Sequence, residues 1–322
     1  MTTPTSSAPT SQVHDVTFTS QGTTVRYYYF PILLQRWTGP LSITLCLKPE
    51  EVSDINDQLA ADNFDSRLSI VQYVATNPGI YPINKLRNLA IRNVKTDHFW
   101  LTDLDMWPSQ GLYEAILRLP NSALQDEVLA IIVPAFEIHA SSCSTFQACT
   151  DLPILPQFPN TKRELNRCIS TRRCSTFRPW DQLHDYHFPE WYRESYTAEL
   201  TPVRCFKGNT QEPYVVVKKS PFLPSFDERF VNYAYNKVQW LEHLRYRGYV
   251  FSILTDGFAV DVPHPFSALR KKFMSVRETT KQTLNKEMYD QFLAELRRNE
   301  TDKSIVKYCK QNNNSTLCST NK

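Results

Sequence analysis

An apolar run that ends in two closely spaced aspartates constrains the fold of this chain more than any other stretch. Residues 98–102 have the pattern of a short buried strand, and Asp103 and Asp105 follow it. Side chains two residues apart on a strand face the same side, so both carboxylates are expected to project from its C-terminal end. Open α/β sheets bind ligands at that end. Two aspartates at such a strand end favour binding of Mg²⁺ or Mn²⁺ together with nucleotide phosphates. The same two aspartates without a preceding apolar run would instead indicate a surface turn.

Strand and helix patterns alternate along the first 133 residues. Strand patterns occupy residues 13–19, 41–47, 68–75, 98–102 and 128–133, and helical patterns occupy 24–37, 49–62, 82–94 and 109–118. Ser109 is expected to cap the last of these helices. The alternation predicts an α/β fold with a mostly parallel central sheet and right-handed crossovers.

The second half of the chain combines an irregular region with a return to regular patterns. Prolines, cysteines, tryptophans and basic residues alternate without a helix or strand period between about 138 and 207. Such a long irregular stretch inside a folded chain is more often functional than idle. Regular patterns follow at 214–218, 227–246, 249–254 and 275–298. We expect a single domain over 13–298, with disordered ends at 1–12 and 299–322.

Composition argues against two classes of partner. The 322 residues carry a net charge of only +3 and no dense block of lysine and arginine, so no nucleic-acid partner is expected. No stretch approaches the roughly 18 apolar residues of a membrane span. Residues 1–12 are polar and lack the apolar region of a signal peptide.

The eight cysteines indicate disulfides and an oxidising compartment. They form no Cys-x-x-Cys motif, which argues against a structural zinc site. Close pairs occur at 143/149, 168/174 and 309/318, although the actual pairing cannot be read from the sequence. Asn-x-Ser/Thr glycosylation triplets start at Asn299, Asn313 and Asn314. These features fit a lumenal protein whose targeting segment is not in this chain.

Five separated blocks together resemble one known family. They are residues 81–90 (YPINKLRNLA), 102–108 (TDLDMWP), 132–137 (IVPAFE), 211–217 (QEPYVVV) and 226–230 (FDERF) with Asn236 and Lys237. Their order and spacing are similar to those of glycosyltransferase family 49, over about residues 13–296. The resemblance implies a GT-A fold and an inverting transfer that uses a UDP-sugar donor and Mn²⁺ or Mg²⁺. It also implies a glycan or glycoprotein acceptor and a place in the Golgi or secretory lumen.

Three polar residues of the 82–94 helix share one face. Asn84, Arg87 and Asn88 stand at positions i, i+3 and i+4. The resemblance places this helix beside the donor pocket. Arg87 would then bind a diphosphate or a donor carboxylate, or hold Asp103 in position. The alternative is a helix-surface cluster that caps a neighbouring loop.

The metal site implied by the resemblance leaves one ligand open. Asp103 and Asp105 would hold the ion. Other members carry a histidine at the position of Asp261, and some also carry one at the position of His264. Either Asp261 replaces the usual histidine or His264 takes its place, and both side chains suit Mn²⁺.

An inverting transfer needs a base that removes the proton from the acceptor hydroxyl. Asp227 and Glu228, just before the predicted 227–246 helix, are candidates, although the helix dipole alone would favour acidic residues there. Glu137 is the other candidate. Asn236 is not a base, but it would bind the acceptor or position a neighbour.

Two tryptophans of the irregular region are candidate platforms for the acceptor. Trp180 and Trp191 lie among Tyr186, Phe188 and Tyr192. Sugars stack their C–H faces on aromatic rings. Aromatic side chains are equally the core residues that a proline- and cysteine-rich region needs.

These observations leave three hypotheses for the function. The leading one is transfer of glucuronate from UDP-glucuronate to a glycan. The second is a transferase of the same fold that uses another UDP-sugar, such as xylose, galactose or N-acetylglucosamine. The third is an inactive glycan-binding or scaffold protein. The intact Asp103 and Asp105, with Asn84 and Arg87, argue against inactivity, whereas the unusual Asp261 argues for it.

Overall fold

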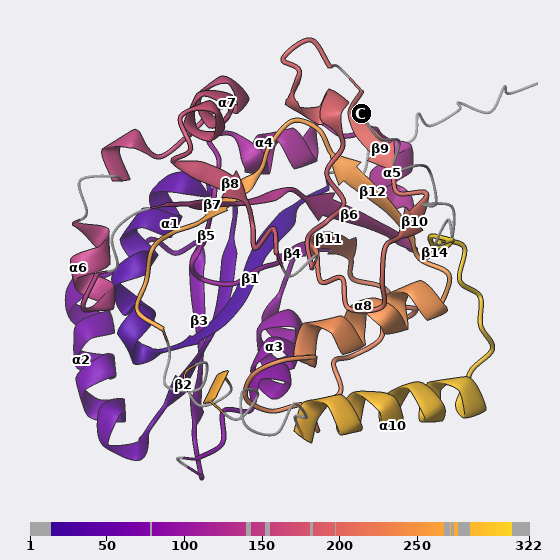
Figure 1. Ribbon diagram of the computed structural model, residues 1–322. Coiled ribbons are helices and arrows are strands. Elements are labelled where there is room, and N and C mark those ends of the chain that lie inside the picture. The colour runs from indigo at the N-terminus through magenta and orange to yellow at the C-terminus, as the bar shows by residue number, and fades with distance from the viewer. Residues whose placement is uncertain are drawn as a thin grey trace, which may run out of the picture.

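The computed structural model describes residues 14–77, 79–139, 143–151, 155–180, 183–196, 198–266, 271, 274–275 and 284–310. Its centre is an eight-stranded sheet with the order β3-β2-β1-β4-β11-β6-β12-β9 (Figure 1). The strands are β1 (Val16–Thr23), β2 (Leu41–Leu47), β3 (Leu68–Val74), β4 (His98–Leu101), β6 (Leu129–Val133), β9 (Leu200–Pro202), β11 (Tyr214–Lys218) and β12 (Val250–Leu254).

Most strands of the central sheet share one direction. β1 pairs in parallel with β2 and β4, β2 with β3, and β6 with β12. β11 is antiparallel to both β4 and β6, and β9 is antiparallel to β12. Only β9 and β11 therefore run against the other strands of this sheet. The predicted α/β fold with a mostly parallel central sheet is confirmed.

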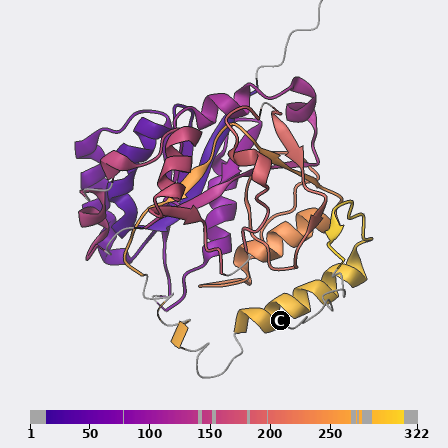
Figure 2. The same cartoon turned by 45° about the horizontal axis from the view of Figure 1, so that its top comes forward.

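Helices connect and cover the parallel strands. α1 (Phe30–Arg36), α2 (Val52–Asp62) and α3 (Ile83–Asn93) lie between β1, β2, β3 and β4 in the chain. β2 is buried at every position, as expected of a strand covered on both faces. α3 packs on β1, β2 and β3. Beyond α3, the helices α8 (Asn236–Tyr246) and α10 (Leu284–Asn299) lie side by side in both views (Figures 1 and 2).

Three central strands continue into a second, four-stranded sheet. Its order is β5-β13-β7-β8, with β5 (Met106–Pro108), β7 (Ala135–Ile138), β8 (Cys174–Thr176) and β13 (Ala259–Asp261). β4 reaches β5 through residues 102–105, β6 reaches β7 through Pro134, and β12 reaches β13 through Gly257. The φ of Gly257 is +133°, and a Cβ atom there would lie 2.6 Å from Leu112 Cδ1, so glycine is required. The second sheet therefore gathers the segments that leave the carboxyl ends of β4, β6 and β12.

The helix predicted over residues 227–246 is wrong in its first half. α8 begins only at Asn236, and Asn232, Ala234 and Tyr235 have φ angles of 61°, 74° and 58°. An α-helix cannot contain such angles. Asn232 holds the segment by tertiary bonds, because its N–H donates to the Tyr81 carbonyl and its Oδ1 accepts from the Tyr81 N–H, both at 2.8 Å. The sequence around Asn232 does not predict this contact, because its partner Tyr81 is far away in the chain.

Three other helix predictions need smaller corrections. Residues 24–37 form a 3-10 turn, Thr24–Tyr29, followed by α1. Ser109 does not cap α4 (Leu112–Leu117), because its Oγ accepts a hydrogen bond of 3.1 Å from the Phe258 N–H. The helix predicted over 275–298 is described from Leu284 to Asn299 as α10, and residues 276–283 lie outside the described residues.

The region from 138 to 207 contains more regular structure than expected. Helices α6 (Phe146–Thr150) and α7 (Lys162–Ser170) lie in it, together with β8 and β9. Thr161 and Glu164 form a reciprocal capping box at the start of α7. The disulfides Cys143–Cys149 and Cys168–Cys174 each close a short loop. Cross-links thus stabilise elements that are too short for a clear sequence period.

Residues beyond α10 return to the domain. β14 (Lys307–Tyr308) pairs in parallel with β10 (Cys205–Phe206), and the disulfide Cys205–Cys309 joins the same segments. Part of the expected disordered end at 299–322 is therefore attached as far as residue 310. Residues 1–13 and 311–322 lie outside the described residues. No helix in the described part of the chain is long and apolar enough to cross a membrane.

Candidate functional site

Asp103 lies at the end of β4 among groups that stabilise its negative charge. Tyr214, on the neighbouring β11, donates a hydrogen bond of 2.8 Å to Asp103 Oδ2. Lys237 Nζ lies 3.2 Å from the same oxygen, and Arg87 Nη2 lies 3.6 Å from Oδ1. Burial alone would raise the pKa of Asp103, but Lys237 and Arg87 lower it below its ordinary value. Asp103 is therefore ionised and its charge is balanced by its own chain.

The polar face of α3 lies against α8 and Asp103. Arg87 is only 3% exposed, and its Nη1 donates to Asn84 Oδ1 at 3.1 Å and to Asn236 Oδ1 at 2.7 Å. Asn84 Nδ2 in turn donates to the carbonyls of Asp227 and Asn236. Because these bonds occupy the guanidinium, the geometry is that of a group that positions Asp103 and α8.

Asp227 and Glu228 lie apart from the carboxylates at the end of β4. Asn88 Nδ2 donates to Glu228 Oε1 at 3.0 Å and to the Phe226 carbonyl. The Asp227 carboxylate forms an ion pair of 2.6 Å with Arg229, which also pairs with Glu295 of α10. Both carboxylates are thus engaged in interactions that fasten residues 226–229 to α3 and α10.

Asp105 belongs to a different group from Asp103. Residues 103–105 form the connection between β4 and β5 rather than part of a strand, so the two side chains reach different partners. Asp105 gathers with Asp261 and His264, and one ligand atom of each lies within 4.8 Å of the others. His264 Nε2 lies 3.1 Å from Asp105 Oδ2 and 4.0 Å from Asp261 Oδ1. The sequence left Asp261 and His264 as alternatives for the third metal ligand, and the structure brings both of them to Asp105.

The protonation of His264 suits a cation at this point. Its Nδ1 lies 2.9 Å from the Pro265 carbonyl, and only an N–H can satisfy that oxygen. In the neutral ring Nε2 then carries a lone pair, which faces the oxygens of Asp105 and Asp261. A second ring group, Phe146, stacks on the imidazole with 5.8 Å between centroids. A ring held this way, with its other nitrogen bonded to a carbonyl, is typical of a metal-ligating histidine.

The charges around Asp105 also favour a cation. Burial and the nearby Asp105 raise the pKa of Asp261 well above its ordinary value. Burial would also raise the pKa of Asp105, but the Arg26 guanidinium lowers it below its ordinary value. Two carboxylates and an imidazole nitrogen are a ligand set suited to Mn²⁺, and with more water to Mg²⁺. The residues present therefore fit a divalent metal.

Arg26 is a site residue that the sequence reasoning missed. Its Nη1 lies 2.5 Å from Asp105 Oδ2, and its guanidinium carbon lies 5.2 Å from the centre of the Phe146 ring. In the sequence it stands within a predicted helix and outside all five quoted blocks, so no signal marked it. Tyr214 and Lys237 do stand in those blocks, and only their position there could have indicated a role.

A cavity of about 580 Å³ adjoins this centre. Its lining includes Thr24, Tyr27, Tyr28, Phe146 and Pro265. Pro265 follows His264 in the chain, and Phe146 contacts both His264 and Arg26. The volume lies within the usual range of small-molecule sites.

Glu137 lies on β7, which flanks β13 on the side away from β5. β7 pairs with β13 so that Glu137 is the register partner of Asp261. Ser175 Oγ donates to Glu137 Oε1 at 2.9 Å, and the Arg178 N–H donates to Oε2 at 3.3 Å. Of the three sequence candidates for a base, Glu137 is the one that the fold brings beside the Asp105 group.

The two candidate tryptophans occupy opposite environments. Trp180 is 69% exposed, close in the chain to Arg178. Trp191 is fully buried, donates a hydrogen bond of 2.9 Å to the Leu254 carbonyl and packs on Phe136. Trp191 is therefore a core residue and offers no face to a sugar.

A second cluster with metal-ligating side chains lies at the other end of β4. His14, Asp97 and His98 form it. His14 Nδ1 lies 2.5 Å from Asp97 Oδ2, and His14 Nε2 lies 2.7 Å from Asn121 Oδ1. Asp97 Oδ1 accepts from the Asp15 N–H. These contacts are those of a hydrogen-bond network that joins the starts of β1 and β4.

Comparison with known sequences identifies the family. The profile of the family described as "Glycosyl-transferase for dystroglycan" matches residues 58–300, which is most of the chain. The chain belongs to glycosyltransferase family 49. Asp103, Asp105, Asp261 and His264 lie inside the matched range, whereas Arg26 lies before it.

Curated relatives in this family are xylosyl- and glucuronyltransferases. The chain is 29% identical over 271 residues to LARGE2s of Danio rerio, 30% over 274 residues to LARGE2 of Mus musculus and 29% over 276 residues to LARGE1 of Homo sapiens. These matches cover 83%, 83% and 84% of this chain but 34%, 37% and 34% of the relatives. The chain therefore spans about a third of the length of the curated relatives it matches.

Solved glycosyltransferases are similar to the family 49 chain at a lower level. GalNAc-T7 with UDP, GalNAc and Mn²⁺ aligns with a TM-score of 0.47 and 8% identity, over 83% of this chain and 48% of its own. S. aureus TarS 1–349 aligns with a TM-score of 0.46 and 13% identity, over 87% of this chain and 70% of its own.

Proposed function

We propose that this chain is the catalytic domain of a metal-dependent, inverting glycosyltransferase. It transfers a sugar, glucuronate in the first instance, from a UDP-sugar to a glycan. The observation that carries the proposal is the convergence of Asp105, Asp261 and His264 beside a cavity of about 580 Å³. Family membership supports the reaction class, and the relatives, which are xylosyl- and glucuronyltransferases, support glucuronate and xylose as the donor sugars to test.

Asp105, Asp261 and His264 would hold the divalent ion, and Mn²⁺ suits their mixed oxygen and nitrogen set. A bound ion supplies Lewis-acid stabilisation of the diphosphate leaving group. Asp103 keeps its bonds to Tyr214 and Lys237 and orients the connection that carries Asp105. Arg26 adds a fixed positive charge on the side of the cavity.

The cavity would receive the nucleoside. Tyr27 and Tyr28 offer aromatic surface, and Thr24 and Asp54 offer polar groups for the base and ribose. The diphosphate would then lie at Arg26 and the Asp105 group, which border the cavity through Phe146 and Pro265. In this proposed order, the transferred sugar would lie toward Glu137.

Glu137 is our candidate for the base. An inverting transfer needs a carboxylate that accepts the proton of the acceptor hydroxyl on the face opposite the leaving group. Glu137 is the register partner of Asp261 and is held by Ser175. Asp227 and Glu228 remain the alternatives, although Arg229 and Asn88 occupy their oxygens.

Trp180 would stack on the acceptor, because its ring is exposed and because it follows closely after Arg178, whose N–H donates to Glu137. Asn236 would act by position only, since it is buried and bonded to Arg87. The disulfides Cys143–Cys149, Cys168–Cys174 and Cys205–Cys309 support the lumen of the secretory pathway, such as the Golgi, as the working compartment.

The test is donor hydrolysis over a panel of UDP-sugars, with Mn²⁺, with Mg²⁺ and with a chelator. We expect metal-dependent release of UDP, fastest with UDP-glucuronate or UDP-xylose. The Asp105→Asn variant should lose it, whereas Asp256→Asn, which removes an exposed aspartate, should not. Preference for another UDP-sugar would support the second hypothesis, and absence of both hydrolysis and metal-dependent UDP binding would support the inactive protein.

A further inference from the structure

Arg178 differs from the other cations of the site. Arg26 pairs with Asp105, whereas Arg87 and Lys237 both lie against Asp103. Among the residues that the structure describes, no carboxylate lies within ion-pair distance of the Arg178 guanidinium. Its Nη1 donates a hydrogen bond of 3.1 Å to the Tyr233 hydroxyl. The side chain is half-buried, so this is a partly desolvated charge, and Glu212 and Asp261 act on it only from beyond ion-pair distance.

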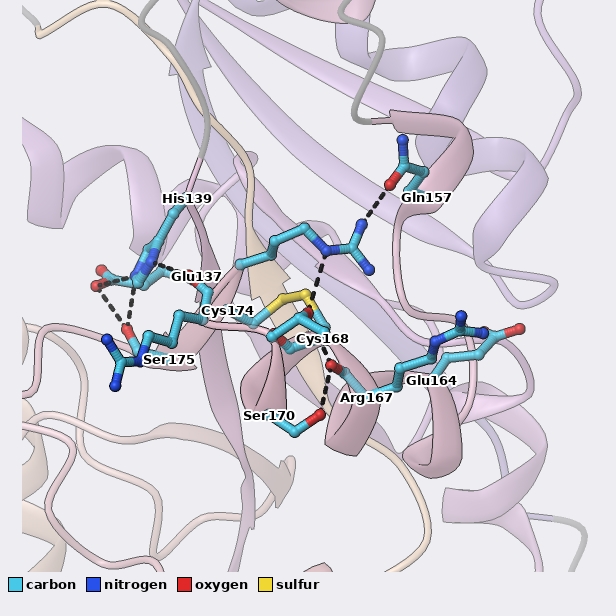
Figure 3. The surroundings of a disulfide bond; sticks show 12 residues. Glu137, His139, Gln157, Glu164, Arg167, Cys168, Ser170, Cys174 and Ser175 are labelled. Carbon is cyan, nitrogen blue, oxygen red and sulfur yellow. Dashed lines mark hydrogen bonds and ion pairs between the residues drawn. A yellow bond between two sulfur atoms is a disulfide. The ribbon is translucent and has the colours of Figure 1, made fainter.

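The backbone of Arg178 is held in an unfavourable conformation. Its φ is 47°, in the left-handed region that non-glycine residues rarely adopt. Glu137 accepts the Arg178 N–H with one carboxylate oxygen and the Ser175 hydroxyl with the other. Figure 3 shows Glu137 and Ser175 beside the Cys168–Cys174 disulfide, which fastens β8 to α7. Strain retained by such cross-links is often found where a side chain must be aimed at a ligand.

The surroundings of the guanidinium keep it positively charged and near the reacting groups. Burial would lower the pKa of Arg178, but Tyr233, Glu212 and Tyr214, with Asp261, raise it above its ordinary value. The Phe177 ring lies 4.8 Å from the guanidinium carbon. Arg178 thus stands on the Glu137 side of the Asp105 group, away from the cavity beside Pro265.

We propose that the Arg178 guanidinium binds the carboxylate of a uronate sugar in this site. The inference rests on the proposed function, because that function puts the nucleoside in the cavity, the diphosphate at the Asp105 group and the transferred sugar beyond them. One N–H of the guanidinium is used by Tyr233, and the remaining donors match the two oxygens of a carboxylate. The uronate is either the donor sugar or the terminal sugar of the acceptor, and the two sources are distinguished below.

The donor arm compares two nucleotide sugars that differ only in a carboxylate or a hydroxymethyl group at C6. Binding of UDP-glucuronate and UDP-glucose is measured by calorimetry with Mn²⁺ for wild type, Arg178→Gln and Arg178→Lys. We expect Arg178→Gln to weaken UDP-glucuronate by about tenfold or more, as for a lost charge-assisted hydrogen bond, and UDP-glucose by less than about twofold. The affinity of Arg178→Lys for UDP-glucuronate should be intermediate, because lysine keeps the positive charge but lacks the planar pair of N–H donors of the guanidinium.

The acceptor arm compares methyl glucuronoside with methyl glucoside by saturation-transfer NMR in the presence of UDP. Arg173→Gln is the matched control, because Arg173 lies in the α7–β8 connection, close in the chain to Arg178, and its guanidinium contacts the uncharged side chains of Thr171 and Gln157. It should leave both arms unchanged.

The outcomes separate the proposals. A selective loss for UDP-glucuronate assigns the carboxylate to the donor, and a selective loss for methyl glucuronoside assigns it to the acceptor. Equal losses for both members of each pair, or no loss in either arm, overturn the role of Arg178. Failure of wild type to bind UDP with Mn²⁺ instead counts against the proposed function, and the acceptor arm then still tests Arg178.

Discussion

Asp103 and Asp105 stand two residues apart in the chain but lie in surroundings of opposite charge. Around Asp103, two cations, Lys237 and Arg87, and the Tyr214 hydroxyl face one carboxylate. Around Asp105, the ion pair with Arg26 faces two carboxylates, because Asp261 joins the group with His264 and Arg178 acts on Asp261 only from beyond ion-pair distance. The charge of Asp103 is thus balanced by neighbouring side chains. The Asp105 group has more carboxylates than paired cations, and His264 adds a nitrogen lone pair.

The difference in surrounding charge indicates different roles for the two aspartates. A buried charge with enough partners stabilises the fold and has little left to offer a ligand. A group in which one carboxylate raises the pKa of another is stabilised when a cation enters. We therefore expect Asp103 to act mainly on stability and Asp105 mainly on metal binding. Substitutions of the two aspartates and of their neighbours test that division.

Asp105→Asn should show the largest effect. It removes a charged oxygen from the proposed ligand set, so Mn²⁺ affinity should fall by about 1,000-fold or more, which is about 4 kcal/mol. Calorimetric titration of Mn²⁺ measures it, with Asp256→Asn as the control for an exposed aspartate. Mn²⁺ binding close to wild type would remove Asp105 from the metal centre.

Asp103→Asn should act on stability instead. It leaves Lys237 and Arg87 buried without their carboxylate, which should cost about 3 kcal/mol in the free energy of unfolding. Urea unfolding in a chelator measures this cost, and Mn²⁺ affinity should stay within about threefold of wild type. If Asp103→Asn loses Mn²⁺ as completely as Asp105→Asn, both aspartates are ligands and the division fails.

Stability of the metal-free protein should respond to pH through Asp261. Its pKa is raised in the folded state, so its contribution is fully present below the ordinary pKa of 3.8 and is lost as the pH rises through the raised value. Asp261→Asn should therefore be more stable than wild type at neutral pH, with a difference that shrinks as the pH falls toward 4. The opposite shift of Asp103 makes its contribution present above 3.8 and lost on acidification. Thermal unfolding with a chelator measures both trends, and a pH-independent difference would contradict them.

Arg26→Met should strengthen metal binding. The Arg26 guanidinium already neutralises part of the Asp105 group, so its removal should raise Mn²⁺ affinity by about tenfold. Arg118→Met, which removes an exposed arginine paired with Asp256, is the control and should change nothing. Weaker Mn²⁺ binding in Arg26→Met would mean that Arg26 orients Asp105 rather than competing with the ion.

Tyr214→Phe should show the smallest effect. It removes one hydrogen bond to Asp103 while both cations remain, so the free energy of unfolding should fall by about 1 kcal/mol. Mn²⁺ affinity should be unchanged. A large change in Mn²⁺ affinity would indicate that the two regions are coupled through Asp103.

The strands were predictable because their pattern is local. The runs at 41–47, 98–102 and 214–218 are apolar in sequence, and the structure buries them as β2, β4 and β11. The helix over 227–246 was mispredicted at its start because Tyr81, far away in the chain, holds Asn232 in a left-handed conformation. α7 was missed because its short period lies among prolines and cysteines, although Thr161 and Glu164 carried a capping signal.

The candidate site shows the same limit at the level of single residues. The spacing of Asp103 and Asp105 marked the place, yet the assumption of a shared strand face did not hold, because residues 103–105 form a connection between two sheets. Trp180 and Trp191 looked alike in sequence, and only burial separated them. Nothing in the sequence around Arg26 indicated that it would reach Asp105.

Short-range hydrophobic and polar patterns in the sequence therefore sufficed to predict the α/β class, the order of the main strands and the region in which the candidate carboxylates lie. Which charges meet depends on the tertiary structure. Asp105, Asp261 and His264 converge because β4, β6 and β12 all continue into the second sheet, and the same meeting of strand ends brings Glu137 beside Asp261. Electrostatic interactions depend on distance in space, and groups 79 residues apart, as Arg26 and Asp105 are, leave no common pattern in the chain.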